Sequence, residues 1–415
     1  MPIFPRSTDP WLLGRISAAI GRAPIRIVLG NGEATSKVES PVATVMVPDR
    51  KTLARLMLDP EMTFGDGYVD GTIQVQGNLA KLLAAIYDSI PGAHPDGAWY
   101  SHLASKWMQW LQANTVRGSR RNIHAHYDIG NDFYKLWLDR QLVYTCAYFP
   151  TPDATLEEAQ TAKLDHVCRK LRLQPGETVV EAGCGWGALA LHMARQYGVS
   201  VKAFNLSHEQ VAFARRRAEE EGLSQQVEFI EDDYRNISGK FDVFLSVGML
   251  EHVGLEHYKD LADVIQRSIG ASGRGLLHFI GRNQPATYSR WMAKRIFPGA
   301  YIPALRQALE IFERWNYSVL DVENLRLHYA KTLEHWLDRF EKSQQQVVAM
   351  YDSEFLRAWR LYLTGSLVAF LNGSLQLFQV VFAASRSRPV WWTRAPLYTA
   401  AQAETEKPEW MHAMS

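Results

Sequence analysis

The stretch Val179-Val180-Glu181-Ala182-Gly183-Cys184-Gly185-Trp186-Gly187 predicts a strand, a glycine turn and the start of a helix, and a helix-like run over residues 188–196 follows it. Glycine lets the backbone turn sharply and lets a ligand approach with no Cβ in the way. The helix N-terminus adds free N–H donors and positive potential. The stretch therefore predicts a nucleotide-type cofactor site. A strand-to-helix turn without a ligand is the alternative, because a glycine-rich turn alone is weak evidence.

The position of the acidic residue indicates which cofactor such a turn would hold. A dinucleotide site needs an acid about 20 residues further on, at the end of the second strand. That strand is expected over Val199–Phe204 and is followed by Asn205, whereas the acid is Glu181, just before the glycines. This placement suits a cofactor with positive charge, such as the amine and sulfonium of S-adenosylmethionine. The phosphate-loop pattern of NTPases is absent from the sequence.

Composition excludes several classes of protein. The 415 residues are 47% hydrophobic, enough for two or three domains, and the net charge of +1 gives no general attraction to nucleic acid. The three cysteines, Cys146, Cys168 and Cys184, lack the spacing of a zinc site or a disulfide framework, so we expect no metal and a reducing cytosol. No apolar run reaches transmembrane length and no signal-peptide pattern is present, so membrane contact should be peripheral.

The N-terminal part, residues 1–98, predicts a small α+β domain. We expect strands at Ile25–Leu29 and Ala43–Val47, helices at Asp49–Leu58 and Leu79–Ser89, and a glycine-punctuated hairpin over Phe64–Gly77. Residues 99–121 predict an amphipathic helix and a basic linker. Its aromatic and basic residues suit either an exposed helix or a membrane surface with anionic lipids: Trp107, Trp110, Arg117, Arg120 and Arg121.

Residues 122–384 alternate between strand and helix patterns, which predicts a Rossmann-like α/β domain with a parallel sheet and helices on both faces. Ligands bind such sheets at the carboxyl ends of the strands. The residues expected there are Glu181, Asn205, Asp232, Asp233, Glu251 and His278. Helices are expected at Ile302–Trp315, Tyr329–Met350 and Leu361–Leu371, a closing strand at Leu375–Phe382, and a polar tail over 385–415.

Further motifs follow in a fixed order along the chain. They are His126-Tyr127-Asp128-Ile129-Gly130-Asn131-Asp132-Phe133-Tyr134, Tyr144-Thr145-Cys146-Ala147-Tyr148-Phe149, Ser246-Val247-Gly248-Met249-Leu250-Glu251-His252, Leu277-His278-Phe279-Ile280-Gly281, Ile296-Phe297-Pro298-Gly299, Tyr329-Ala330-Lys331-Thr332-Leu333 and residues 375–382. With the glycine turn, this set resembles the cyclopropane fatty acid synthase family of S-adenosylmethionine-dependent methyltransferases, over roughly residues 25–382. Several motifs in order are more specific than any one of them.

The resemblance implies an enzyme that adds a methylene from S-adenosylmethionine across a cis double bond of a phospholipid acyl chain. It also implies an N-terminal domain that presents lipid, a homodimer, and a place on the inner face of the cytoplasmic membrane. A bound bicarbonate would act as the base. The catalytic residues that match are Cys146, Glu251, His278, Ile280 and Tyr329. The expected cofactor-binding residues are Tyr144, Thr145, Glu181, Gly183, Gly185, Gly187, Asn205, Gln210, Asp233 and Tyr234.

The chemistry explains these residue types. Methyl transfer to an alkene leaves a carbocation, and ring closure needs a positioned base that is shielded from water. Aromatic faces such as Tyr148, Phe149 and Trp291 could stabilise the cation.

Three positions depart from the family pattern: Glu181 where aspartate is frequent, Asn205 where threonine is common, and Ser366 where a cysteine is often found. A methyltransferase that makes branched or methylene-branched chains therefore remains an alternative. A non-catalytic lipid-binding relative is an alternative of another class, although it would not need the Cys146, Glu251, His278 and Tyr329 set.

Overall fold

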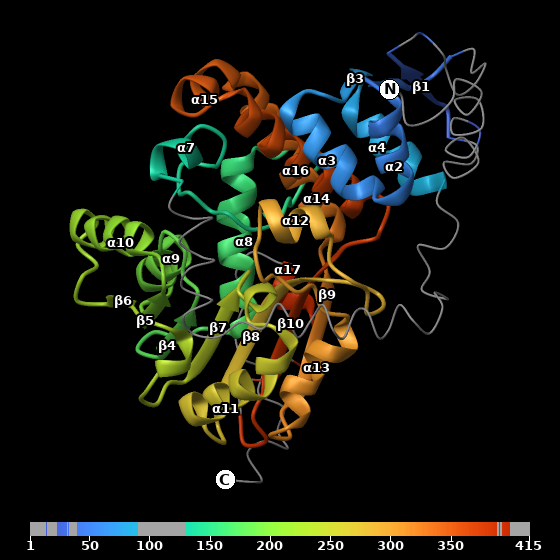
Figure 1. The fold of residues 1–415 in the computed structure, drawn as a ribbon. Coiled ribbons are helices and arrows are strands. Elements are labelled where there is room, and N and C mark those ends of the chain that lie inside the picture. Colours follow the sequence, from blue (N-terminus) through green and yellow to red (C-terminus); the bar gives the residue numbers. More distant parts are fainter. Residues whose placement is uncertain are drawn as a thin grey trace.

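The structure, a computed structural model, describes residues 23–30, 40–89, 129–387 and 392–398, together with positions 14, 32 and 390. Within these residues the chain forms a seven-stranded sheet covered by helices and a smaller unit built on a three-stranded sheet (Figure 1). The predicted helix at 99–121 and the motif residues His126 and Asp128 lie outside the described residues.

The large sheet has the strand order β6-β5-β4-β7-β8-β10-β9. Strands β4 to β8 run parallel to one another, whereas β10 is antiparallel to both β8 and β9. This arrangement confirms the Rossmann-like α/β fold. The strands are β4 (Thr178–Ala182), β5 (Ser200–Asn205), β6 (Val227–Glu231), β7 (Val243–Val247), β8 (Arg274–Gly281), β9 (Ser318–Asn324) and β10 (Gln376–Ala383).

Alternate side chains of the sheet build two separate cores, one on each face. Val179 and Leu245 point into a cluster with α8, α9 and α10, while Val180 and Phe244 point into a cluster with α11 and α13. Both faces are thus covered, as expected for a mostly parallel sheet. The helices are α8 (Leu156–Leu171), α9 (Ala188–Tyr197), α10 (His208–Glu220), α11 (Tyr258–Ile269) and α13 (Leu305–Glu313).

A further helical layer, rich in aromatic residues, lies above the sheet in the view of Figure 1. It consists of α7 (Asn131–Lys135), α14 (Arg326–Lys342), α15 (Gln344–Met350) and α16 (Ser353–Leu371). Phe133 is fully buried there, and its ring meets Trp359 edge-on at 5.0 Å. The indole of Trp186, in the glycine turn, donates to Asn131 Oδ1 at 2.7 Å. The second sequence motif therefore packs directly on the first.

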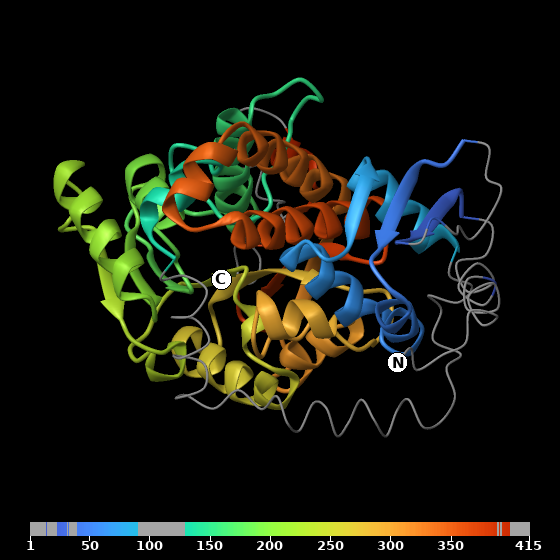
Figure 2. The same cartoon turned by 45° about the horizontal axis from the view of Figure 1, so that its top comes forward.

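The N-terminal unit is an α+β structure, as predicted. Strands β1 (Ile25–Leu29) and β2 (Ala43–Val47) are parallel, and β3 (Gln74–Gly77) is antiparallel to β2. Helices α2 (Arg50–Leu58), α3 (Pro60–Asp70) and α4 (Leu79–Ser89) complete it. Helices α3 and α4 pack on α16, and α3 also packs on α12 (Arg290–Arg295), so the unit lies against the helical layer (Figure 2).

The predicted hairpin over Phe64–Gly77 is wrong, because its first half is helix α3. Asp59 caps this helix by accepting from Met62 N, and Pro60 occupies its first turn. The glycines that suggested a turn instead allow close packing. A Cβ at Gly65 would lie 2.3 Å from the indole ring of Trp291, and one at Gly67 would lie 2.8 Å from Ile73.

Other boundaries also differ from the expectation. The helix expected over Tyr329–Met350 is two helices that meet at Ser343, and the one expected from Ile302 begins at Leu305. His278 lies inside β8, not at its end. Strand β9, helix α8 and the short α17 (Ala395–Tyr398) in the predicted tail were not anticipated. Among the described helices, none combines the length and apolar character needed to cross a membrane.

The close contact at Gly65 gives a stability prediction. Gly65→Ala should lower the free energy of unfolding by about 1–3 kcal/mol, because the new methyl group overlaps the Trp291 indole. Gly365→Ala is the matched control: it also changes a helical glycine, but a Cβ there meets nothing within 4 Å. Urea unfolding of both variants measures the difference, and equal stability of the two would contradict the packing argument.

Candidate active site

The glycine turn has the conformation that its sequence predicts. Gly183, Gly185 and Gly187 all have positive φ, at 84°, 54° and 82°. The amides of Gly183 and Cys184 both donate to the carbonyl of Phe204, at 2.9 and 3.1 Å, which fixes the turn to the end of β5. A Cβ at Gly185 would meet nothing within 4 Å, whereas one at Gly187 would overlap Phe229. Gly185 thus faces open space, and Gly187 permits packing.

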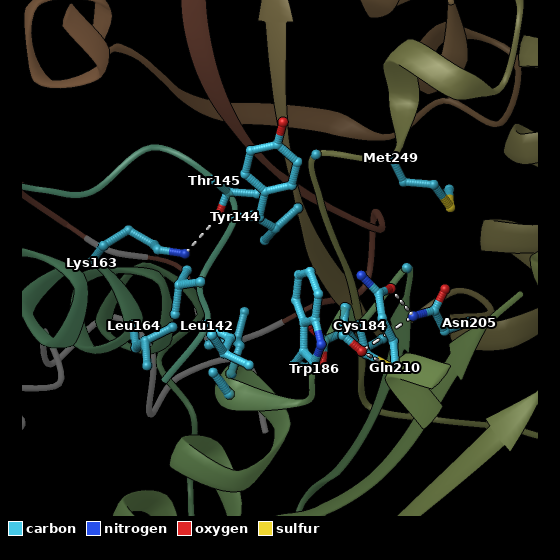
Figure 3. A pocket seen from close by; sticks show the side chains of 18 of the residues that line it. Leu142, Tyr144, Thr145, Lys163, Leu164, Cys184, Trp186, Asn205, Gln210 and Met249 are labelled. Atoms are coloured by element: carbon cyan, nitrogen blue, oxygen red, sulfur yellow. Dashed lines mark hydrogen bonds between the residues drawn. The ribbon is translucent and has the colours of Figure 1, made fainter. Parts of the chain in front are cut away.

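A small cavity of about 120 Å³ lies at this turn, at the point where the strand order reverses between β4 and β7 (Figure 3). Such reversals open a crevice at the carboxyl ends of the strands. Seven of the residues expected to bind the cofactor line it: Tyr144, Thr145, Glu181, Gly183, Gly185, Asn205 and Gln210. Gly187, Asp233 and Tyr234 are not among the lining residues, and both carboxylate oxygens of Asp233 accept from Arg235.

Glu181 is a buried carboxylate on the wall of this cavity. It is 2% exposed, and among the described residues no group donates to its Oε2. Burial raises its pKa to about 7, although nearby Lys163 opposes that shift. The side chain can therefore accept from a cationic or N–H group that enters the cavity.

Lys163 is a site residue that the sequence analysis missed. It is buried on α8 and lines the same cavity, where its Nζ donates to Thr145 Oγ1 at 2.9 Å (Figure 3). Burial lowers its pKa to about 8. A single lysine on an amphipathic helix usually predicts a solvated side chain, so no sequence signal distinguished it.

Asn205 and Gln210 form the opposite side of the cavity in Figure 3. Asn205 Nδ2 donates to Gln210 Oε1 at 2.7 Å and to the carbonyl of Gly185 at 3.2 Å. Gln210 Nε2 is buried, and no described residue accepts from it. This unsatisfied amide and Glu181 Oε2 are a donor and an acceptor available to a polar ligand.

A second cavity, of about 1520 Å³, adjoins the first. Most of its lining is apolar and comes from both the N-terminal unit and the helical layer, including Ile27, Val45 and Phe370. Its volume exceeds the roughly 300–1,000 Å³ of a typical small-molecule site. The residues common to the walls of both cavities are Tyr144, Thr145, Gly248 and His252. Ligands in the two cavities would therefore contact the same four residues.

Glu251 stands on the wall of the large cavity, in the 3₁₀ turn η3 (Leu250–His252) after β7. Its Oε1 accepts from the backbone amide of Ile280 at 2.6 Å, and its Oε2 is buried with no donor among the described residues. Burial raises its pKa to about 7, and the Ile280 hydrogen bond only partly offsets this. Glu251 is thus poised to exchange a proton near neutral pH.

His278 lies on β8, two positions before Ile280, whose amide donates to Glu251. Its Nδ1 is 3.0 Å from Gln379 Nε2, and because an amide NH₂ only donates, Nδ1 accepts and Nε2 holds the proton. Nε2 has no acceptor among the described residues. Burial lowers the pKa of His278 well below its usual value, so the ring is a neutral donor.

Cys146 and the backbone of Tyr329 both contact the carbonyl of Leu325. The sulfur of Cys146 lies 3.1 Å from the carbonyl of Ala147 and 4.0 Å from that of Leu325, which also accepts from Tyr329 N. Burial raises the pKa of the Cys146 thiol, so it stays protonated. Ile280 and Tyr329 line the large cavity, whereas Cys146 and His278 are buried and are not among its lining residues.

The aromatic residues separate into two groups. Trp291 and Tyr329 line the large cavity, together with Tyr144, whose hydroxyl lies 2.7 Å from that of Tyr362. Tyr148 instead stacks between His166 and His328, at 4.3 and 4.7 Å, and Phe149 stacks on His335. Neither Tyr148 nor Phe149 is among the lining residues, whereas Tyr362 and His252 are lining residues that the sequence analysis did not select.

Comparison with known proteins places this geometry in a family. Residues 114–380 match the family model described as "Mycolic acid cyclopropane synthetase", and residues 17–92 match a domain of unknown function. The chain is 34% identical over 389 residues to a "Probable fatty acid methyltransferase" of Pseudomonas putida, covering 90% of this chain and 96% of that protein. It is 34% identical over 351 residues to the "Cyclopropane-fatty-acyl-phospholipid synthase" of Escherichia coli K12, covering 82% and 88%.

A solved structure gives a consistent result. The mycolic acid cyclopropane synthase CmaA1, complexed with SAH and CTAB, is 30% identical and superposes with a TM-score of 0.61. The match covers 64% of this chain and 98% of that one.

The raised pKa of Glu251 predicts how stability depends on pH. The unfolded carboxyl loses its proton near its usual pKa of 4.5, whereas the folded one keeps it to about pH 7. The proton therefore stabilises the folded state below pH 4.5, and this contribution is lost as the pH rises through 7. Glu251→Gln, which keeps the acceptor for Ile280 N, should reduce the loss of stability between about pH 5 and pH 8 by up to about 3 kcal/mol.

Urea unfolding across this pH range measures the effect. Glu209→Gln, at an exposed position on α10, controls for the loss of one negative charge. An unchanged pH dependence in Glu251→Gln would show that the carboxyl is not protonated in the folded state.

Proposed function

Because this chain belongs to the mycolic acid cyclopropane synthetase family of S-adenosylmethionine-dependent methyltransferases, we propose that it is a cyclopropane-fatty-acyl-phospholipid synthase. Its substrates would be S-adenosylmethionine and the cis double bond of an unsaturated phospholipid acyl chain. The observation that carries the proposal is that Tyr144, Thr145, Gly248 and His252 line both the small cavity at the glycine turn, which contains the buried polar groups of Glu181 and Gln210, and the large, mainly apolar cavity. A polar methyl donor and an apolar chain can meet there.

The small cavity fits the methyl donor. S-Adenosylmethionine, when bound, would supply a methyl group on a positively charged sulfur. Glu181 Oε2 would accept from its cationic part, and Gln210 and Asn205 would contact its polar groups. Gly185 lets the ligand approach the backbone, since a Cβ there would project into open space. The roles expected for Asp233 and Tyr234 remain predictions, because neither lines the cavity.

The large cavity provides the conditions that a carbocation needs. The double bond of the acyl chain accepts the methyl group, and the cation that forms must be kept from water until the new methyl loses a proton and the ring closes. The cavity walls are mainly apolar, and the faces of Trp291 and Tyr329 can stabilise positive charge.

The polar groups beside that cavity fit a small oxyanion that acts as a base. Bicarbonate, when bound, would supply an acceptor for the proton. His278 Nε2–H is a buried donor without an acceptor, and Glu251 Oε2 is a buried oxygen that can take a proton. Cys146 and Tyr329 would complete the set as neutral donors. Ile280 would act through Glu251, since its amide already donates to that carboxylate.

The product could also be a methyl-branched or methylene-branched chain, because the same cation leads to all three. Ser366 lines the large cavity where the family often has cysteine, so no thiolate stands at that position. We further propose peripheral association with the inner face of the cytoplasmic membrane and a homodimer. Both proposals come from the resemblance and need their own tests by vesicle co-sedimentation and by light scattering.

The assay that tests the function uses vesicles of unsaturated phospholipid and methyl-labelled S-adenosylmethionine. The label should enter a cyclopropane ring at the former double bond. Because a ring and a methylene branch have equal mass, NMR or fragmentation of the released acyl chain must identify the product. Absence of label with every unsaturated lipid would refute the proposal, and saturated phospholipid is the control.

Two substitutions should separate cofactor binding from proton removal. Glu181→Gln should weaken S-adenosylmethionine binding by about 10- to 100-fold, the cost of one charged hydrogen bond. Glu251→Gln should leave that affinity unchanged while abolishing turnover, because it removes a proton acceptor beside the other cavity. Calorimetry gives the affinities and the labelled assay gives the rates. Loss of cofactor affinity in Glu251→Gln would contradict the assigned roles.

A further inference from the structure

Arg282 lies on the wall of the large cavity, just beyond the end of β8 and two residues after Ile280. Its backbone amide donates to the carbonyl of Pro303 at 2.8 Å, which fixes the position of the residue. In the side chain, NH1 donates to the carbonyl of Thr287 at 3.0 Å. Nε is buried, and no described residue accepts a hydrogen bond from Nε or NH2. One edge of the guanidinium is thus available to a ligand.

The charge of Arg282 is not neutralised within the described part of the chain, where no carboxylate lies within ion-pair distance of it. The titratable groups that act on it most strongly are the phenols of Tyr288, Tyr87 and Tyr301. Burial lowers the pKa of this arginine, as expected for a cation that has lost water without gaining an anion. Glu61 lines the same cavity but accepts from Ser289 Oγ and from Trp291 N.

Neighbouring arginines show the contrast. Arg290 pairs with Asp59 at 3.0 Å, and Arg295 pairs with Asp66 at 2.8 Å, so both arginines of α12 are matched by acids of the N-terminal unit. Among the described residues that line the large cavity, Arg282 is the only arginine, and no described carboxylate pairs with it. Arg282 is partly exposed, but its Nε is buried without an acceptor among the described residues, and a buried cationic donor without an anionic partner is costly; this points to an anion as its partner in the functional complex.

The shape of the free edge indicates the kind of anion. Nε and NH2 form a planar fork that matches two oxygens of a phosphate group. Asn283, Gln284 and Ser289 line the same cavity and can bind the remaining polar groups of a ligand. Most of the other lining is apolar. The ligand that fits both features has an apolar chain and a phosphate at its head.

We propose that Arg282 binds the phosphate of a glycerophospholipid whose acyl chain occupies the large cavity. The inference depends on the proposed function in one respect, which is that the ligand of the large cavity is a lipid with an acyl chain. Arg282 lies two positions after Ile280, so their Cα atoms are about 7 Å apart if the chain stays extended. The phosphate anchor and the Glu251–Ile280 pair are therefore held by one segment, which would set the part of the acyl chain that reaches the methyl donor.

Equilibrium binding of unreactive saturated lipids tests the inference. The probes are 1-myristoyl-lysophosphatidylglycerol and monomyristoylglycerol, which share the acyl chain and differ by the phosphate, each used below its critical micelle concentration. In calorimetry the wild type should bind the phosphate lipid about 10- to 100-fold more tightly, the effect of a charged hydrogen-bonded pair. Arg282→Gln should abolish this preference and leave the affinity for monomyristoylglycerol unchanged.

Matched variants keep the test decisive. Arg282→Lys retains the charge without the fork and should keep part of the preference, which also separates loss of recognition from loss of folding. Lys294→Gln, at an exposed position on α12, should keep all of it, because it changes only general surface charge. A preference that survives in Arg282→Gln, or an equal loss of affinity for both lipids, would overturn the inference.

Two further probes identify the source of the anion. Myristate that binds as tightly as the phosphate lipid, with the same dependence on Arg282, would overturn the assignment to phosphate. Inorganic phosphate should displace the phosphate lipid only weakly and should not displace monomyristoylglycerol. If inorganic phosphate binds as tightly as the phosphate lipid, the assignment to a lipid head group is overturned. Since these lipids are not substrates, failure of the methyl-transfer assay would leave this result intact. Failure of the wild type to bind any acyl probe would count against the proposed function itself.

Discussion

The reversal of strand order between β4 and β7 is the constraint on which the rest of the site depends. Helices on opposite faces must leave the sheet in opposite directions there, so the carboxyl ends of these strands border a crevice that neither helix fills. The double hydrogen bond from Gly183 and Cys184 to Phe204 fixes one side of this crevice, and Gly248 N, which donates to the carbonyl of His278, fixes the other. Glu181 and Glu251 are each held near one of these sides, and each has a buried Oε2 that accepts no hydrogen bond from a described residue.

The two cavities differ in kind because different layers build them. The small one is formed by the sheet edge and the start of α9, where backbone polar groups are plentiful. The large one is formed where the N-terminal unit meets α16, and apolar side chains predominate. Tyr144 links them, because it lines both cavities and its hydroxyl contacts that of Tyr362 on α16. A movement of α16 would therefore shift Tyr144 and change the shape of the small cavity.

Much of the fold could be predicted from the sequence, because apolar alternation and glycine turns are local signals. The strands from β4 to β8 and the α+β character of the N-terminal unit were obtained in this way. The failures concern features set by distant contacts. Gly65 was assigned to a turn because glycine is a turn residue. Its actual role depends on Trp291, more than two hundred positions later, which packs on it. Strand β9 is a sheet edge with Asp321 and Glu323 facing Lys170, and it lacks the apolar pattern of a buried strand. Lys163 and Arg282 were missed because nothing local distinguishes a buried cation from a solvated one.

The origin of the large cavity has a consequence for how such proteins can diverge. Ile27 and Val45 belong to a small unit that packs on α12 and α16, and they form part of the wall of the large cavity. Replacing them with larger or smaller residues would shorten or lengthen the accessible space without disturbing Glu251 or the glycine turn. If the proposed function holds, the residues that limit the length of a ligand and the residues that carry the chemistry therefore lie in different parts of one polypeptide and can change independently.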